Sequence, residues 1–142
     1  MTLEQLLILA FIGHFVLIAS LYVWLTIERQ VAVVKKEVKV DAFVKPGADP
    51  ARSMRVARNL SNQFELPMFA LFAALFIYES HEVILLDVIG AWLFLAGRVI
   101  HTAVQTLTQN VPLRGVVFTL NFIGVVMLMV HVTCILLHLG GA

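Results

Sequence analysis

Four long apolar stretches dominate the pattern of this chain. Each is long enough for the roughly 20 residues that a helix needs to cross a membrane. They cover residues 3–27, 52–78, 83–107 and 112–139. The first carries Glu4 instead of a basic segment and exceeds a signal-peptide core of about 7–15 residues, so we expect a retained helix. The pattern predicts an all-α integral membrane protein, a four-transmembrane-helix bundle in one domain over residues 1–142.

Polar segments connect the predicted helices. The first connection covers residues 28–51, and its sequence KPGADP at 45–50 breaks any helix there. The sequence ESHE at 79–82 predicts a tight turn. The sequence QNVP at 109–112 predicts another turn, because a proline at its end suits the start of a helix.

Composition agrees with a membrane protein. The chain has 142 residues, of which 61% are hydrophobic and 13% are charged. A soluble domain is typically about 45–50% apolar and about 25% charged. An ordinary soluble domain is therefore excluded, and we expect membrane lipids around the helices.

The basic residues are unevenly distributed and predict an orientation. Eight of the ten lysines and arginines lie between positions 29 and 58, and the other two, Arg98 and Arg114, flank the third connection. Cytoplasmic loops of membrane proteins carry an excess of such residues. We therefore expect the first and third connections in the cytoplasm, with both termini and the ESHE turn on the non-cytoplasmic side. No nucleic-acid partner is expected.

A polar stripe marks the start of the second predicted helix, within RVARNLSNQFELP at 55–67. Residues spaced 3, 4 and 3 apart share one helix face, and this spacing relates Arg55, Arg58, Asn62 and Glu65. A helix over 52–78 would be about 40 Å long, which exceeds a hydrocarbon core of about 30 Å. The charged half can thus lie at the cytoplasmic interface. Pro67 frees the carbonyl of Gln63, which predicts a kink near that boundary.

The third and fourth helices bring further polar residues to the same depth. Arg98, His101 and Gln105 are spaced 3 and 4 apart, and Arg114 opens the fourth helix. Glu65 is the only acid in this group, so the excess of guanidinium groups favours an anionic ligand with carboxylates. We expect Glu65 and Arg98 to face each other within salt-bridge reach, directly or through a ligand. A simpler interpretation is that Arg55 and Arg58 bind lipid phosphate at the cytoplasmic interface. Likewise, the Glu65–Arg98 pair could serve only to hold the second and third helices together.

Other reactive residues predict no separate site. Cys134 lies in an apolar run and is expected to be a small buried hydrophobic residue. No metal site is expected, because His14, His131 and His138 have no close ligand partners in the sequence.

The polar motifs resemble those of the MAPEG family, the membrane-associated proteins in eicosanoid and glutathione metabolism, which includes microsomal glutathione transferases. On helix two the family pattern is Arg, then Asn-x-x-Glu, then Pro, which here corresponds to Arg58, Asn62, Glu65 and Pro67. The helix-three pattern Gly-Arg-x-x-His corresponds to Gly97, Arg98 and His101. The helix-four pattern Pro-x-Arg corresponds to Pro112 and Arg114.

The resemblance implies a homotrimer with glutathione as co-substrate, bound between subunits, and a lipophilic co-substrate that arrives from the bilayer. It implies that the tripeptide is held by Arg58, Asn62, Glu65, Arg98 and His101. We add Arg55, which shares their helix face, to these expected binding residues. Arg114 would lie beside the thiol, and an adjacent arginine lowers a thiol pKa from about 8.5 and raises the thiolate fraction.

Three positions depart from the pattern of several glutathione-using members. Hydroxyl residues of those members are replaced here by Gln105, Gly115 and Phe118. Two functions follow from the sequence. The first is a glutathione-dependent membrane enzyme, a transferase or peroxidase that acts on a hydrophobic electrophile or lipid hydroperoxide. The alternative is a non-catalytic MAPEG-like protein that binds a lipid or anion, or an accessory subunit of a larger membrane assembly.

Overall fold

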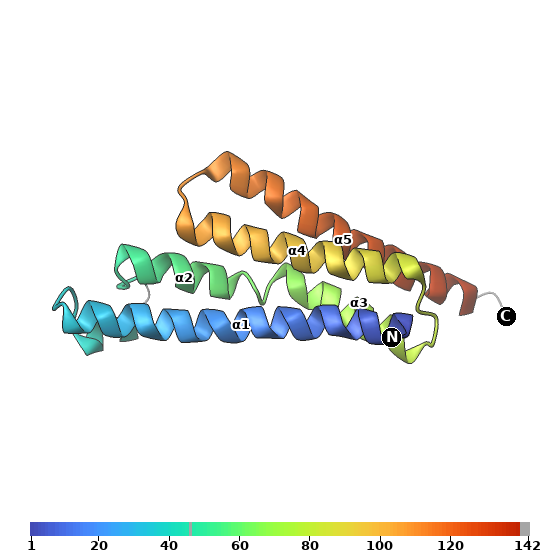
Figure 1. The fold of residues 1–142 in the computed structure, drawn as a ribbon, viewed down its shortest axis with the longest axis horizontal. Coiled ribbons are helices and arrows are strands. Elements are labelled where there is room, and N and C mark those ends of the chain that lie inside the picture. Colours follow the sequence, from blue (N-terminus) through green and yellow to red (C-terminus); the bar gives the residue numbers. More distant parts are fainter. Residues whose placement is uncertain (46, 140–142) are drawn as a thin grey trace.

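The protein is a bundle of long antiparallel helices (Figure 1). The computed structural model describes residues 1–45 and 47–139. Their elements, in order, are α1 (Leu3–Val34), η1 (Val40–Val44), α2 (Ala51–Ser61), α3 (Leu66–Glu79), α4 (Leu85–Leu107) and α5 (Val111–Leu139). With α2 and α3 taken together, four segments of the described chain are long and apolar enough to cross a membrane. The predicted all-α membrane bundle with four spanning helices is thus confirmed.

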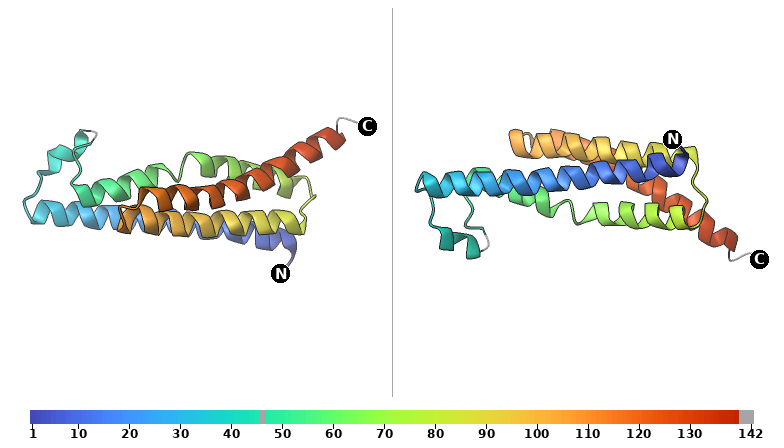
Figure 2. Two further views of the ribbon diagram at one scale, coloured as in Figure 1. Left: turned by 90° about the horizontal axis from the view of Figure 1, so that it is seen from above. Right: turned by 60° about the horizontal axis from the view of Figure 1, so that its bottom comes forward.

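The first helix is longer than predicted. It continues past residue 27 to Val34, so the connection to α2 is shorter than 28–51 and contains the short helix η1. The extra turns are tied to this connection, because Arg29 donates two hydrogen bonds of 2.8 Å to the carboxylate of Asp49. The Arg29 guanidinium also lies 5.1 Å from the ring centroid of Phe43. Figure 2 shows η1 projecting from this end of α1.

The second spanning segment is interrupted rather than only kinked. The helix α2 ends at Ser61 and α3 begins at Leu66, which leaves a gap of non-helical backbone over 62–65. Pro67 lies in the first turn of α3. Because proline has no N–H group and its ring clashes with the carbonyl four residues earlier, the helix cannot continue unbroken through Gln63. The kink was predicted near Gln63, which lies within this gap. The helix is, however, interrupted over four residues and not merely bent.

Small residues let α4 and α5 approach closely. A Cβ atom added at Gly124 would lie 2.5 Å from the carbonyl oxygen of Gly90 and 2.8 Å from the nitrogen of Phe94. A Cβ atom added at Gly97 would lie 2.8 Å from the nitrogen of Asn121. Membrane helices associate through such small residues because lipid tails provide no hydrophobic driving force between them. The close contact joins the first half of α4 to the middle of α5, and the start of α5 follows the end of α4 across the short turn at 108–110.

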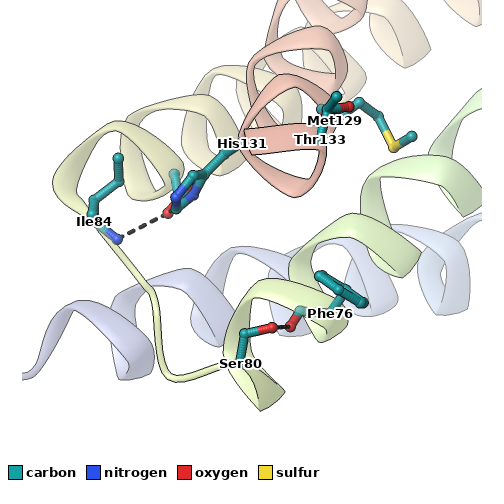
Figure 3. Close-up of polar contacts among 7 residues, drawn as sticks. Phe76, Ser80, Ile84, Met129, His131 and Thr133 are labelled. Atoms are coloured by element: carbon teal, nitrogen blue, oxygen red, sulfur yellow. Dashed lines mark hydrogen bonds and ion pairs between the residues drawn. The ribbon is translucent and has the colours of Figure 1, made fainter. Parts of the chain in front are cut away.

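A separate polar cluster lies at the start of α4, near the α3–α4 turn (Figure 3). Asp87 is 1% exposed, and one of its oxygens accepts a hydrogen bond of 2.9 Å from the backbone N–H of Ile84. The Nδ1 atom of His131 on α5 lies 2.9 Å from both carboxylate oxygens. His131 has no close ligand partner in the sequence, and the fold brings Asp87 of α4 to it. The side chain of His138 lies outside the described residues. Cys134 on α5 is exposed in the single chain, so the expectation that it is buried is wrong.

Candidate functional site

Three segments of the bundle enclose a cavity of about 500 Å³. Of the side chains that the sequence singled out, the cavity is lined by Arg58, Asn62, Glu65, Arg98, His101 and Arg114. They come from α2 and the interruption that follows it, from the second half of α4 and from the start of α5. Residues far apart in the sequence thus meet at one level of the bundle. Three arginines and one glutamate give this wall a positive balance, which suits an anionic ligand.

Arg55 is not among the residues that line this cavity. It lies on α2 one turn before Arg58, about 4.5 Å farther along the helix axis. The cavity of the single chain thus begins at Arg58, and binding by Arg55 stays a prediction.

Arg98 lies against the interruption between α2 and α3. Its side chain is among the largest fully buried ones, and its residue is 1% exposed. Its Nε donates a hydrogen bond of 3.0 Å to the Oε1 of Gln63, and its Nη2 donates one of 3.0 Å to the carbonyl of Asn62. That carbonyl is available because the helix stops there, since the last carbonyls of a helix have no partner within it.

The direct form of the predicted Glu65–Arg98 contact is not formed. Within the described residues, the ion pairs are Arg29–Asp49, Arg52–Glu28 and His131–Asp87. Two donors of Arg98 are occupied by neutral oxygens of the interruption instead. Glu65 and Arg98 do line the same cavity, so a ligand between them stays a prediction.

A buried amide network supports this wall, and the sequence did not reveal it. Gln63 is 1% exposed, and its Nε2 donates to the Oδ1 of Asn59 at 3.1 Å and to the hydroxyl of Thr102 at 3.3 Å. Its Oε1 lies 3.0 Å from the Nε2 of His14 on α1. The signal that could have found it is a shared spacing: Asn59 and Gln63 are four residues apart, as are Arg98 and Thr102.

The position that departs from the family tyrosine is part of the same network. The Oε1 of Gln105 accepts hydrogen bonds from the Nδ2 of Asn59 at 2.9 Å and from the Nδ2 of Asn62 at 3.3 Å. Gln105 also lines the cavity, together with Gly115 and Phe118. These three positions provide no hydroxyl group. A hydroxyl does reach the cavity from a residue that the sequence did not single out, Ser61 at the end of α2.

His101 forms the inner part of the wall. It is 3% exposed, and its ring meets that of Phe118 edge to face with 6.1 Å between centroids. Its Nδ1 is buried without a hydrogen-bond partner in the described residues. A buried polar atom of this kind costs free energy until a ligand or water satisfies it. His101 lines the cavity, and binding of a ligand by this side chain stays a prediction.

The whole arrangement can be compared with known proteins. A family model described as the MAPEG family matches residues 7–134, which is nearly the whole chain. The chain belongs to the MAPEG family. Neither curated proteins nor solved structures gave a match. Membership confirms the resemblance seen in the sequence, and it places this membrane protein among those of glutathione and eicosanoid metabolism.

Proposed function

We propose that this MAPEG protein is a glutathione-dependent membrane enzyme, a transferase or peroxidase for hydrophobic electrophiles or lipid hydroperoxides. The observation that carries the proposal is the charge of the cavity wall, where three arginines and one glutamate converge. Glutathione has two carboxylates and one ammonium group, so the ligand and the wall are complementary. A volume of about 500 Å³ also falls within the range of about 300–1,000 Å³ that is usual for small-molecule sites.

A second, apolar groove supports a lipophilic co-substrate. It has a volume of about 300 Å³ and runs between α3 and α5, where its walls include Phe69, Phe122 and Met129. Leu66 lines both this groove and the cavity. The rings of Phe118, at the cavity, and Phe122, in the groove, stack with 6.5 Å between centroids. A hydrophobic molecule from the bilayer can thus lie next to the glutathione thiol.

The chemistry in this proposal rests on Arg114. A cationic side chain beside a thiol favours the thiolate, which is the nucleophile. In the transferase reaction the thiol gives up its proton to water, and the thiolate sulfur forms a bond to the electrophilic carbon of the co-substrate. The bond from that carbon to its leaving group breaks, and the leaving group departs with the electron pair. Arg58, Asn62, Glu65, Arg98 and His101 position the tripeptide, and Glu65 can pair with the glutathione ammonium group.

One observation favours the second candidate function, a non-catalytic protein that binds a lipid or another anion. Gln105, Gly115 and Phe118 line the cavity without a hydroxyl that could steady a thiolate. Such a protein would bind a carboxylate or phosphate on the same arginines and would not activate a thiol. It could then act alone or as an accessory subunit of a larger membrane assembly.

Glutathione titration of the purified protein by calorimetry tests the proposal. Arg58→Ala should weaken binding about tenfold or more, since a hydrogen bond to a charged group contributes about 1.5–3 kcal/mol. Arg52→Ala is the matched control, because Arg52 lies on the same helix with 77% of its side chain exposed and does not line the cavity. Equal binding by both variants and the wild type would contradict the proposed site. Absence of binding to the wild type would contradict the proposed function.

A further inference from the structure

We propose that Gln63 is a positioning residue that holds the Arg98 guanidinium with a neutral oxygen, so that the positive charge of Arg98 stays available to an anion in the cavity. The inference rests on the proposed function for the identity of the anion. It concerns a residue that does not line the cavity itself. Its basis is the hydrogen-bond geometry of the interruption between α2 and α3.

Gln63 is connected on every side. Its Oε1 accepts from Arg98 at 3.0 Å, and its Nε2 donates to Asn59 and Thr102. The Nε2 of His14 lies 3.0 Å from the same Oε1. Because an amide oxygen only accepts, His14 must donate in this contact. Gln63 therefore links α1, α2 and α4, and its side chain cannot turn without breaking several bonds.

The hold on Arg98 uses only part of its hydrogen-bonding capacity. A guanidinium group has five N–H donors in a fixed plane. One N–H at Nε and one at Nη2 are used by Gln63 and by the carbonyl of Asn62. Since Arg98 also lines the cavity, the remaining N–H groups are the ones that a ligand can meet. Fixing the plane in advance removes the ordering cost that a free arginine would incur on binding.

The neutrality of Gln63 is as important as its geometry. A carboxylate in its place would hold the guanidinium equally well and would also cancel its charge. An amide oxygen fixes the group and leaves the charge uncompensated within the buried network. The one acid of the cavity wall, Glu65, forms no ion pair with Arg98 in the described residues. The charge of Arg98 therefore remains for the ligand.

Two substitutions distinguish the effect of the hydrogen bond from Arg98 to Gln63 from the effect of the missing charge on Gln63. Gln63→Leu removes the hold and should weaken glutathione binding about tenfold, in line with the loss of an oriented hydrogen bond to a charged group. Gln63→Glu keeps an acceptor for Arg98 and for His14, but it removes the N–H donors to Asn59 and Thr102. This variant should melt above Gln63→Leu and below the wild type, and it should still bind glutathione about tenfold more weakly. A purely structural role predicts instead that affinity follows the melting temperature in both variants.

The control is Thr106→Val, which removes a buried hydrogen bond of 2.7 Å to the carbonyl of Thr102 on the same helix and lies outside the cavity. It should leave the affinity for glutathione unchanged. In an Arg98→Ala background, Gln63→Leu should cause no further loss of affinity. An equal loss in both backgrounds, or a Gln63→Glu variant with wild-type affinity, would overturn the inference.

A reagent specific for arginine gives a readout that needs no glutathione. Labelling with phenylglyoxal, followed by peptide mass spectrometry, should leave Arg98 protected in the wild type and in Gln63→Glu. The same residue should become reactive in Gln63→Leu, while Arg52, whose side chain is 77% exposed, serves as the internal reference. If the wild type binds no glutathione, the proposed function fails, and this labelling still decides whether Gln63 holds Arg98. Protection of Arg98 in Gln63→Leu would overturn the inference.

Discussion

At the scale of single residues, the three arginines of the cavity have different surroundings. Arg98 is buried and held by Gln63 and the carbonyl of Asn62, whereas Arg58 and Arg114 are exposed on the chain. The buried one is fixed before a ligand arrives, and the exposed ones are free to adjust. The motif spacing could predict which arginines gather here. It could not predict their different settings, because these depend on amides that look like ordinary polar positions in the sequence.

Outside the membrane-spanning segments, the contact between Arg29 and Asp49 makes a prediction about pH. The hydrogen bonds from Arg29 lower the pKa of the Asp49 carboxyl below its ordinary value. The pair therefore stabilises the fold above the unfolded-state pKa of about 3.9, and this contribution is lost as the pH falls through the lower folded-state pKa. Asp49→Asn should lower the melting temperature at pH 7, with a cost of about 1 kcal/mol or less for such a partly exposed pair.

The difference in melting temperature between wild type and Asp49→Asn should shrink in acid. Asp41→Asn, an exposed aspartate on η1, provides the control for loss of a carboxylate from the same connection. A difference that stays constant from pH 7 down to the acid limit would show that the pair does not stabilise the fold through its charge.

At the scale of helices, the sequence predicted where elements exist better than where they end. The apolar stretches located each spanning segment, because length and hydropathy alone decide whether a helix can cross the bilayer. Pro67 located the break in the second one. The unwinding over 62–65 required partners from elsewhere, since Arg98 satisfies the carbonyl of Asn62 that the break exposes. Likewise, α1 continues to Val34 where Asp49 returns from the connection to bind Arg29.

The close approach of α4 and α5 predicts a large effect at Gly124. In Gly124→Ala the new Cβ would meet the backbone oxygen of Gly90 at 2.5 Å, and backbone cannot move aside as a flexible side chain can. The two helices must separate, and we expect a loss of about 1–3 kcal/mol in the free energy of unfolding, as for other overpacked contacts. Thermal unfolding in detergent measures it.

The control for this prediction is Gly115→Ala on the same helix. No atom lies within 4 Å of a Cβ built there, so the substitution should leave the stability equal or slightly raised. Equal melting temperatures for the two variants would mean that α4 and α5 are not in close contact.

At the scale of the whole molecule, we propose that the chain acts as a homotrimer. The start of α1, the α3–α4 turn and the end of α5 lie at one end of the bundle, while the cavity lies toward the other (Figure 1). Arg58, Glu65 and Arg114 are exposed on the single chain at the level of that cavity. Charged groups inside a membrane protein usually face other protein or a water-filled space. A neighbouring subunit beside the cavity would provide such surroundings.

Native mass spectrometry in mild detergent tests the assembly. We expect the mass of three chains, with glutathione retained in the trimer. Monomers alone, at protein concentrations that preserve other membrane oligomers, would contradict the proposal.

The central claim is that the cavity binds glutathione and that Arg114 stabilises its thiolate. The most direct measurement is the ultraviolet absorbance of the thiolate during glutathione titration near neutral pH, in the wild type and in Arg114→Ala. We predict a saturable thiolate signal in the wild type and its loss in Arg114→Ala, with glutathione affinity largely kept and turnover lowered by about 10²–10³, as for removal of one electrostatic stabiliser. Glutathione binding to the wild type without a thiolate signal would contradict the enzyme and leave the non-catalytic anion-binding protein in its place.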